Sequence, residues 1–331
     1  MNGRLLEGLP LLDWVFVDGN VCIPGDYGAY RGEDRIKELR RILSEKCAFT
    51  KTGELAFEKL FDVNCGTVPY ATGFIIGGKK AERGQWPFMA ALFAYTPPQF
   101  FCGGNVITKN HVLTAAHCIK QKYSSENLEA KDITILFGHH NFKDRNLVRD
   151  DVRGLQHIAV HPDWNTTQVK YDADVAVLFL NEAIEFSNFI QPVCLTKDQE
   201  ISTKEDGYVV GWGNDGGSTV HETFLKQVLV RSVEDSACFA SDHNLGSIYS
   251  ARHFCAKGED EGPCSGDSGG GFFVKFRGLW TLRGTVSAGA FRTHGGCDVG
   301  RFTLYTKLKE FADWIIRTVP QVDGMEPDQS I

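Results

Sequence analysis

Residues 88–94 read FMAALFA and residues 105–115 read NVITKNHVLTA, two short apolar stretches in a chain of 331 residues. Gly, Asp and Asn residues separate further stretches of the same kind, at 133–137, 173–180, 207–212, 271–276 and 279–286. Short strands at nearly regular spacing, with turn residues between them, are typical of an all-β barrel or sandwich. The residues alone leave these two architectures open.

Segments with other sequence patterns flank this β-rich region. Near the C-terminus, apolar residues follow helical spacing at Leu308, Phe311, Ala312, Ile315 and Ile316. Residues 32–47 also show helical spacing, opposite a basic face that is either solvated or docks an acidic partner. Residues 66–74, with two glycines and a proline, indicate an exposed linker. We therefore expect an N-terminal module over residues 1–74 and a β-rich domain over residues 75–331 that closes with a helix.

The composition narrows the class of protein and its partners. With 42% hydrophobic and 23% charged residues, the chain is globular and long enough for about two domains of ~150 residues. The net charge is −7 and no long basic run occurs, which argues against nucleic acid or an anionic membrane as the main partner. No apolar run is long enough to span a membrane.

The ten cysteines indicate the compartment. Their number is even and no two form a C-x-x-C pair, so five disulfides are favoured over a zinc site. The first twenty residues do not have the pattern of a signal peptide, because Glu7, Pro10 and Asp13 interrupt the apolar run. We therefore expect an extracellular protein on the cysteines alone.

Three short motifs carry residues suited to nucleophilic catalysis. Residues 266–270 read GDSGG, and flanking glycines allow a tight turn that exposes the hydroxyl of Ser268. Residues 114–118 read TAAHC and contain His117, and residues 174–178 read DVAVL and begin with Asp174. Taken singly, these are also consistent with a glycine-rich turn, a core histidine and an exposed aspartate at a strand start. Together they provide the base that a serine hydroxyl needs and the acid that orients this base.

The order His, Asp, Ser with these local sequences resembles the chymotrypsin/trypsin family of serine proteases, from Ile75 to about Val319. The resemblance implies two antiparallel six-stranded β-barrels with a C-terminal helix. It implies that His117 is the general base and acid, that Asp174 orients it, and that Ser268 attacks the scissile carbonyl. The backbone N–H groups of Gly266 and Ser268 would form the oxyanion hole. Asp172 matches the family motif less well than Asp174.

The same resemblance implies how the cysteines pair and how the enzyme is activated. The implied disulfides are Cys102–Cys118, Cys238–Cys255, Cys264–Cys297 and Cys65–Cys194, which leaves Cys22 to pair with Cys47. Residues 75–78, IIGG, resemble the N-terminus that zymogens of this family expose on cleavage. The new ammonium group of Ile75 would then pair with Asp267. Phe74 precedes this bond, whereas most family members have Arg or Lys there.

By resemblance, the substrate pocket contains Gly262, Ser287, Gly289 and Thr303. None of them is a carboxylate, so a buried Arg or Lys side chain of a substrate would have no partner. We therefore expect cleavage after apolar residues, unless Asp298, on a rim that looks longer than usual, folds inward.

The remaining expectations concern modification, cofactors and partners. Asn165-Thr166-Thr167 is an N-glycosylation sequon. His139 and His140 lack a third metal ligand at suitable spacing, so we expect no metal and no cofactor. Expected partners are protein or peptide substrates, an upstream activating protease and protein inhibitors. The narrower resemblance is to secreted arthropod immune or developmental proteases that act in cascades. The alternatives are a non-catalytic homologue acting as a cascade scaffold, and a binding function in residues 1–74.

Overall fold

The computed structural model describes residues 15–17, 20–22, 65–69, 79–94, 97–123, 127–143, 152–197, 201–214, 223–241, 243–259, 261–289, 297–298 and 300–319. The chain divides into two units, Met1–Ala56 and Phe57–Ile331. In the first unit, strands β1 (Val15–Val17) and β2 (Asn20–Cys22) pair antiparallel. The helix expected over 32–47, the pairing of Cys22 with Cys47 and the boundary expected after Phe74 lie outside the described residues.

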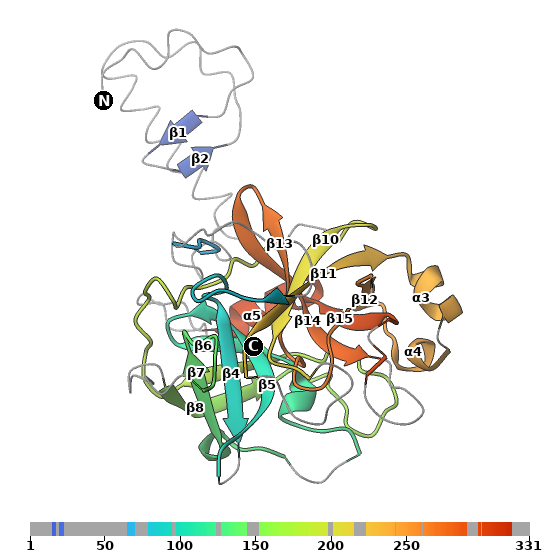
Figure 1. The fold of residues 1–331 in the computed structure, drawn as a ribbon, viewed down its shortest axis with the longest axis horizontal. Coiled ribbons are helices and arrows are strands. Elements are labelled where there is room, and N and C mark those ends of the chain that lie inside the picture. The colour runs from blue at the N-terminus through green and yellow to red at the C-terminus, as the bar shows by residue number, and fades with distance from the viewer. Residues whose placement is uncertain are drawn as a thin grey trace, which may run out of the picture. The chain divides into compact units, whose positions relative to one another are not determined.

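Two closed barrels form the second unit, and the first is built from β4 to β9 (Figure 1). Around this barrel the antiparallel strands follow the order β4 (Met89–Ala94), β5 (Gln99–Thr108), β6 (His111–Thr114), β9 (Ala176–Leu180), β8 (Val152–Val160) and β7 (Ile133–Phe137). β7 pairs with β4 and closes the ring. Alternate residues fill the interior, among them Leu92, Val106 and Leu178. Residues 105–115 thus cover the end of β5, a turn and β6.

The second barrel also has six antiparallel strands. In order around it they are β10 (Asp206–Gly211), β13 (Gly271–Phe276), β14 (Leu279–Gly289), β15 (Thr303–Lys307), β12 (His253–Lys257) and β11 (Lys226–Val233). β10 pairs with β11 to close the ring, and β3 (Lys79–Lys80) extends it beside β11. Phe254, Phe272 and Tyr305 pack in its interior. The predicted fold of two six-stranded barrels is therefore confirmed.

The helices of the described residues are short. They comprise the 3-10 helices η1 (Ala116–Cys118), η2 (Ala130–Asp132) and η4 (Leu308–Phe311), and the α-helices α3 (Asp235–Ser241), α4 (His243–Ile248) and α5 (Ala312–Thr318). The predicted C-terminal helix corresponds to η4 and α5, which bury Phe311, Ala312 and Ile315 as the spacing requires. Within the described part of the chain, no helix has the length and apolar character needed to cross a membrane.

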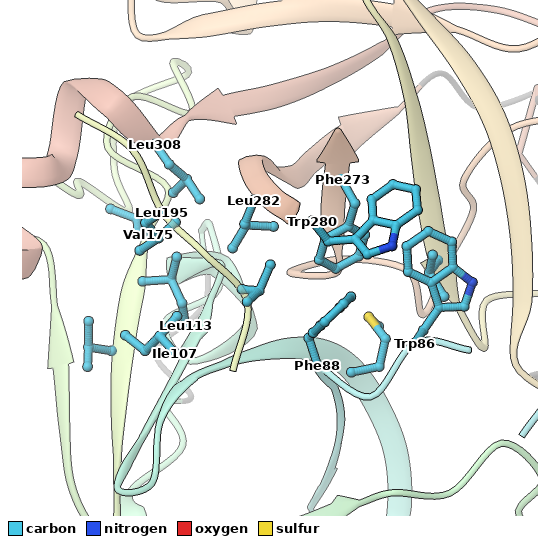
Figure 2. Packing of buried hydrophobic residues seen from close by; sticks show 14 of the residues in the cluster. Trp86, Phe88, Ile107, Leu113, Val175, Leu195, Phe273, Trp280, Leu282 and Leu308 are labelled. Carbon is cyan, nitrogen blue, oxygen red and sulfur yellow. The ribbon is translucent and has the colours of Figure 1, made fainter. Parts of the chain in front are cut away.

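A large apolar cluster joins the two barrels (Figure 2). Trp86 and Phe88 precede β4 of the first barrel, and Phe273 and Trp280 belong to β13 and β14 of the second. The ring centroids of Trp86 and Trp280 are 4.8 Å apart, and those of Phe88 and Phe273 are 5.6 Å apart. Such aromatic pairs bury large apolar surfaces and prefer defined geometries. The cluster therefore fixes one barrel against the other, and loops from both meet at their junction.

Candidate active site

His117 and Asp174 meet at one end of the first barrel. His117 lies in η1 directly after β6, and Asp174 precedes β9, which pairs with β6 through Thr114 and Ala176. The His117 Nδ1 atom is 2.7 Å from Asp174 Oδ2, and the His117 backbone N–H donates to Asp174 Oδ1 at 2.8 Å. Both carboxylate oxygens thus bind one residue, which fixes the orientation of the imidazole ring.

The Asp174 carboxylate is buried and remains ionised. Its side chain has no exposed surface, whereas that of His117 is 18% exposed. Burial alone raises the pKa of Asp174, but attraction to His117 and hydrogen bonds from His117 and Ser287 outweigh it, so the pKa is lowered. The Ser287 hydroxyl donates to Asp174 Oδ2 at 2.5 Å. Ser287 was expected in the substrate pocket; its hydroxyl binds the aspartate, and its place in the pocket stays a prediction.

Asp172, the weaker candidate by sequence, is committed to an ion pair. The Arg252 guanidinium donates to both of its carboxylate oxygens, at 2.9 and 2.6 Å. The same guanidinium donates to Asp163 at 2.9 Å. Hydrogen bonding from Arg252 lowers the pKa of Asp172 to about 2, although burial opposes this. Asp172 therefore serves the packing of its loop, and Asp174 serves His117.

The turn that carries Ser268 lies between β12 and β13 and is held from both barrels. From the first barrel, the Gly103 N–H donates to the Ser268 carbonyl at 2.9 Å. The Asn105 side chain, on the same strand β5, donates to the Gly269 carbonyl at 2.8 Å. From the second barrel, the Val286 carbonyl accepts from the Gly269 N–H at 2.9 Å. Three hydrogen bonds, two from β5 and one to β14, thus hold the backbone around Ser268.

Gly269 has to be glycine at this point. Its φ is +74°, and a Cβ atom there would lie 2.2 Å from the Thr114 hydroxyl and 3.0 Å from the Ala115 nitrogen. The turn therefore packs against the residues that immediately precede η1 and His117. The hydrogen bonds between described residues do not include one from the Ser268 hydroxyl to His117. Without bound substrate, catalytic hydrogen bonds are often long.

Asp267, next to Ser268, is half-buried, and its carboxylate faces backbone N–H groups. Its carboxylate accepts hydrogen bonds from the N–H groups of Gly213 and Cys264, at 2.8 and 2.9 Å. Burial raises its pKa to about 6, against the lowering effect of these hydrogen bonds. The salt bridges between described residues do not include Asp267. Phe74 and Ile75 lie outside the described residues, so the pairing with a new N-terminus stays a prediction.

Four disulfides join cysteines that the resemblance pairs: Cys65–Cys194, Cys102–Cys118, Cys238–Cys255 and Cys264–Cys297. The Cys102 and Cys118 sulfurs also lie near His117, within 4.8 Å of one another as a group. Because these two sulfurs are bonded to each other, they have no thiolate to offer a metal. The disulfide is therefore part of the scaffold beside His117.

The expected pocket residues lie on or beside the second barrel. Thr303 on β15 is buried and pairs with Gly289 on β14, and Gly262 is half-buried in the segment before the Ser268 turn. Asp298, the alternative source of a pocket carboxylate, forms an ion pair with Arg301 at 2.9 Å. The negative charge of Asp298 is thus already neutralised by Arg301.

Three further residues of the site were not anticipated from the sequence. Asn105 was hidden in an apolar stretch, Tyr171 packs its ring 6.0 Å from that of His117, and Lys122 binds the loop that contains Tyr171. A lysine or an asparagine gives no sequence signal of such contacts, because the same residue types are common on solvated surfaces.

Two closed six-stranded barrels, a His–Asp pair with a buried aspartate and a glycine-flanked serine are the architecture of the two-barrel serine protease family. The family model described as Trypsin matches residues 75–315, and the chain belongs to this family. The chain is 30% identical to serine protease gd of Drosophila melanogaster, over 70% of this chain and 50% of that protein.

Two further relatives are covered over most of their length. Chymotrypsin-like elastase family member 1 of Rattus norvegicus is 28% identical, over 75% of this chain and 90% of its own. The proclotting enzyme of Tachypleus tridentatus is 30% identical, over 76% of this chain and 68% of its own. The match with the Drosophila protein spans half of that protein's length.

Proposed function

We propose that this protein is a serine endopeptidase whose triad is His117, Asp174 and Ser268. The observation that supports it best is the buried, ionised Asp174 bound through both oxygens to His117. In the proposed reaction, the hydroxyl oxygen of Ser268 bonds to the scissile carbonyl carbon while His117 takes the hydroxyl proton. His117 then gives this proton to the leaving amine as the C–N bond breaks. Water, activated by the same histidine, hydrolyses the acyl-enzyme.

Free backbone donors beside Ser268 support an oxyanion hole. Within the described residues, the N–H groups of Asp267, Gly269 and Gly270 all donate hydrogen bonds, whereas those of Gly266 and Ser268 donate none. Two unused donors in one tight turn are suited to stabilise the negative charge that develops on the carbonyl oxygen. This supports the assignment of Gly266 and Ser268 to that role.

The proposal is tested with an organophosphonate probe that reacts only with an activated serine. The cleaved protein should be labelled, and Ser268→Ala should abolish labelling and lower kcat by roughly 10⁴–10⁶-fold. Ser265→Ala, which changes an exposed serine three residues away, is the matched control and should be labelled fully. Labelling that persists in Ser268→Ala would contradict the triad. A non-catalytic scaffold, the alternative function, would show no labelling at all, although its usual signature is a replaced triad residue.

We further propose that the chain is a zymogen activated by cleavage between Phe74 and Ile75. Burial raises the pKa of Asp267 and the charge of Lys226 opposes this, but no salt bridge between described residues includes this carboxylate, and the ammonium of Ile75 would provide a direct partner. Because Cys65 is bonded to Cys194, the segment before the cut should remain attached. The cleaved protein should therefore run as one band on SDS gels without reductant and as two bands with it. Full activity of the uncleaved chain would contradict the zymogen proposal.

Location, partners and modification follow from the same reading. Four disulfides support an extracellular location. Since two relatives are the arthropod proteins serine protease gd and a proclotting enzyme, we place the enzyme in a proteolytic cascade, with an upstream activating protease and protein inhibitors. Asn165 is exposed and is the proposed glycan site.

For primary specificity, we propose cleavage after apolar residues. Gly262 and Thr303 carry no charge, and Asp298 is paired with Arg301, so a substrate cation would be left without a partner. Matched peptides ending in Arg, Phe, Leu and Ala should be hydrolysed fastest after Phe or Leu. A preference for Arg would overturn this reading, and loss of that preference in Asp298→Ala would identify the carboxylate responsible.

A further inference from the structure

Lys122, in the segment that follows η1, is unusual among the surface lysines because main-chain carbonyls enclose its ammonium group. Its Nζ donates to the carbonyls of Asn165, of Gln168 at 2.9 Å and of Lys170 at 2.6 Å. An ammonium has three N–H donors, so every one of them is used. All three acceptors belong to one loop, which Lys122 therefore ties to the segment that follows His117.

Two aromatic rings also lie beside the same ammonium. Nζ lies 4.2 Å from the ring centroid of Trp164 and 5.3 Å from that of Tyr171. Loss of hydration lowers the pKa of Lys122, while the charge of Asp174 opposes the change. The ring of Tyr171 also packs edge-on against His117, at 6.0 Å between centroids. The ring of Tyr171 thus contacts both the Lys122 ammonium and the His117 ring.

Two further hydrogen bonds join the same segments. The Trp164 indole N–H donates to the Lys120 carbonyl at 3.0 Å, and the Tyr123 N–H donates to the Thr166 carbonyl at 3.1 Å. Tyr123 has a φ of +56°, a left-handed conformation that a bulky residue adopts only where its surroundings impose it. The joined loops expose two large apolar side chains, Tyr123 at 70% and Val169 at 54%.

We propose that Lys122 is a positioning residue that holds residues 164–171 as a preformed apolar wall beside His117, on which the residues flanking the cleaved bond of a polypeptide substrate bind. The inference rests on the proposed peptidase function. A wall that is already ordered saves the substrate the entropy of ordering it. Loss of the ordered wall weakens the binding of substrates long enough to reach Tyr123 and Val169. Substrates too short to reach these residues bind as before.

The experiment compares Lys122→Met with Lys120→Met. Methionine keeps an apolar stem against the Trp164 and Tyr171 rings but removes all three donors. Lys120 is exposed, and removing its charge two residues away controls for electrostatics. Each variant is assayed on a single-residue ester and on a tetrapeptide with leucines around the cleaved bond. We expect Lys122→Met to raise KM for the tetrapeptide about tenfold, with the ester changed less than twofold, and Lys120→Met to match the wild type on both.

Hydrogen exchange of the amides in residues 164–171 gives a readout that needs no catalysis. These amides should exchange faster in Lys122→Met and unchanged in Lys120→Met. Unchanged exchange in Lys122→Met, an equal effect of the two variants, or a parallel loss on ester and tetrapeptide would each overturn the inference. If the wild type hydrolyses neither substrate and Ser268 takes up no probe, the proposed peptidase function fails, and the inference about substrate binding fails with it. A wild type that is active, with variants that do not differ, rejects the inference alone.

Discussion

At the scale of single residues, the site depends on how two neighbouring aspartates are partitioned. Asp172 and Asp174 are separated only by Ala173, whose φ of +57° turns the chain between them. Asp172 faces Arg252, while Asp174 faces His117 and Ser287. Each carboxylate is hydrogen-bonded to its own donors, which stabilise its charge. Neither aspartate can therefore replace the other in its role.

This partition predicts opposite phenotypes for two amide substitutions. Asp174→Asn should lower kcat about 10⁴-fold with a modest loss of stability, because an amide cannot hold the His117 tautomer that accepts a proton. Asp172→Asn should leave kcat within a few-fold and lower the free energy of unfolding by about 1 kcal/mol, because only the ion pair with Arg252 weakens. Ester hydrolysis and urea unfolding measure the two effects. If Asp172→Asn had the larger loss of kcat, the assignment would be reversed.

Buried histidines outside the site make stability depend on pH. His253 on β12 is fully buried, and its Nδ1 accepts from the Ser250 N–H at 3.0 Å. Burial lowers its pKa from 6.5 to about 4, and burial does the same for His111. Between pH 4 and 6.5, each of these two histidines therefore binds a proton in the unfolded chain but not in the folded chain. Stability from these groups is therefore complete above pH 6.5 and is lost as the pH falls toward 4.

His253→Gln should reduce this acid sensitivity. A glutamine oxygen can still accept from the Ser250 N–H, but the side chain does not titrate. The slope of the unfolding free energy between pH 4 and 6.5 should decrease by about 1 kcal/mol per pH unit, measured by urea unfolding at several pH values. His111→Gln should act in the same direction. A slope unchanged from the wild type in both variants would refute the argument.

At the scale of secondary-structure elements, strand β5 connects the first barrel to the nucleophile turn of the second. Gly103 on this strand lies so close to Gly270 that a Cβ atom there would be 3.2 Å from the Gly270 backbone. Asn105, two residues later, is fully buried and donates to the carbonyls of Leu113 and Gly269. β5 therefore supports the turn that carries Ser268, although it contributes no proposed catalytic group.

Asn105→Ala should consequently affect catalysis as well as stability. Two buried carbonyls lose their donor, so the free energy of unfolding should fall by roughly 2–3 kcal/mol. The Ser268 turn loses the hydrogen bond from Asn105 to the Gly269 carbonyl, so kcat should fall at least tenfold, with KM nearly constant. Thr108→Val, at the far end of the same strand, is the matched control, because it removes the contact to His111 away from the site. It should lower stability without lowering kcat, and equal kcat losses in both variants would argue against the tie.

At the scale of the whole molecule, the carboxylate of Asp267 lies beside the Ser268 turn without a salt bridge to a described residue. Burial raises its folded pKa to about 6, above the value near 3.9 expected in the unfolded chain. A raised carboxyl pKa means that the stability from this group is complete below about pH 4 and is lost as the pH rises through 6. On the proposed function, cleavage before Ile75 supplies an ammonium that reverses this loss.

The cleaved protein should therefore be more stable than the intact chain at pH 7–8, by about 3 kcal/mol, and the difference should vanish below about pH 4. Thermal unfolding of both forms between pH 4 and 8 measures it. Asp267→Asn is the control, since it has no charge to bury, and its two forms should unfold alike at every pH. Equal stability of the wild-type forms at pH 7, or a difference that persists at pH 4, would reject the pairing.

The sequence by itself determined the local features of this protein. Apolar stretches separated by turn residues predict strands, and GDSGG predicts a tight turn because Gly269 adopts a positive φ that other residues avoid. Ten cysteines without a C-x-x-C pair predict disulfides. Resemblance to a known family, and not periodicity, distinguished two barrels from a sandwich, since strands of either architecture have the same alternation.

Only the tertiary structure decided which side chains meet. His117 and Asp174 are 57 positions apart, and pairing of β6 with β9 brings them within hydrogen-bond distance. Ser287 is 113 positions from Asp174, and the packing of the second barrel against the first brings these two together. The enclosure of Lys122 by carbonyls from a loop 43 to 48 positions away has no local signature either. The physical reason is that a local sequence constrains backbone conformation, whereas the partner of a polar side chain is set by whichever distant segment the barrels place beside it.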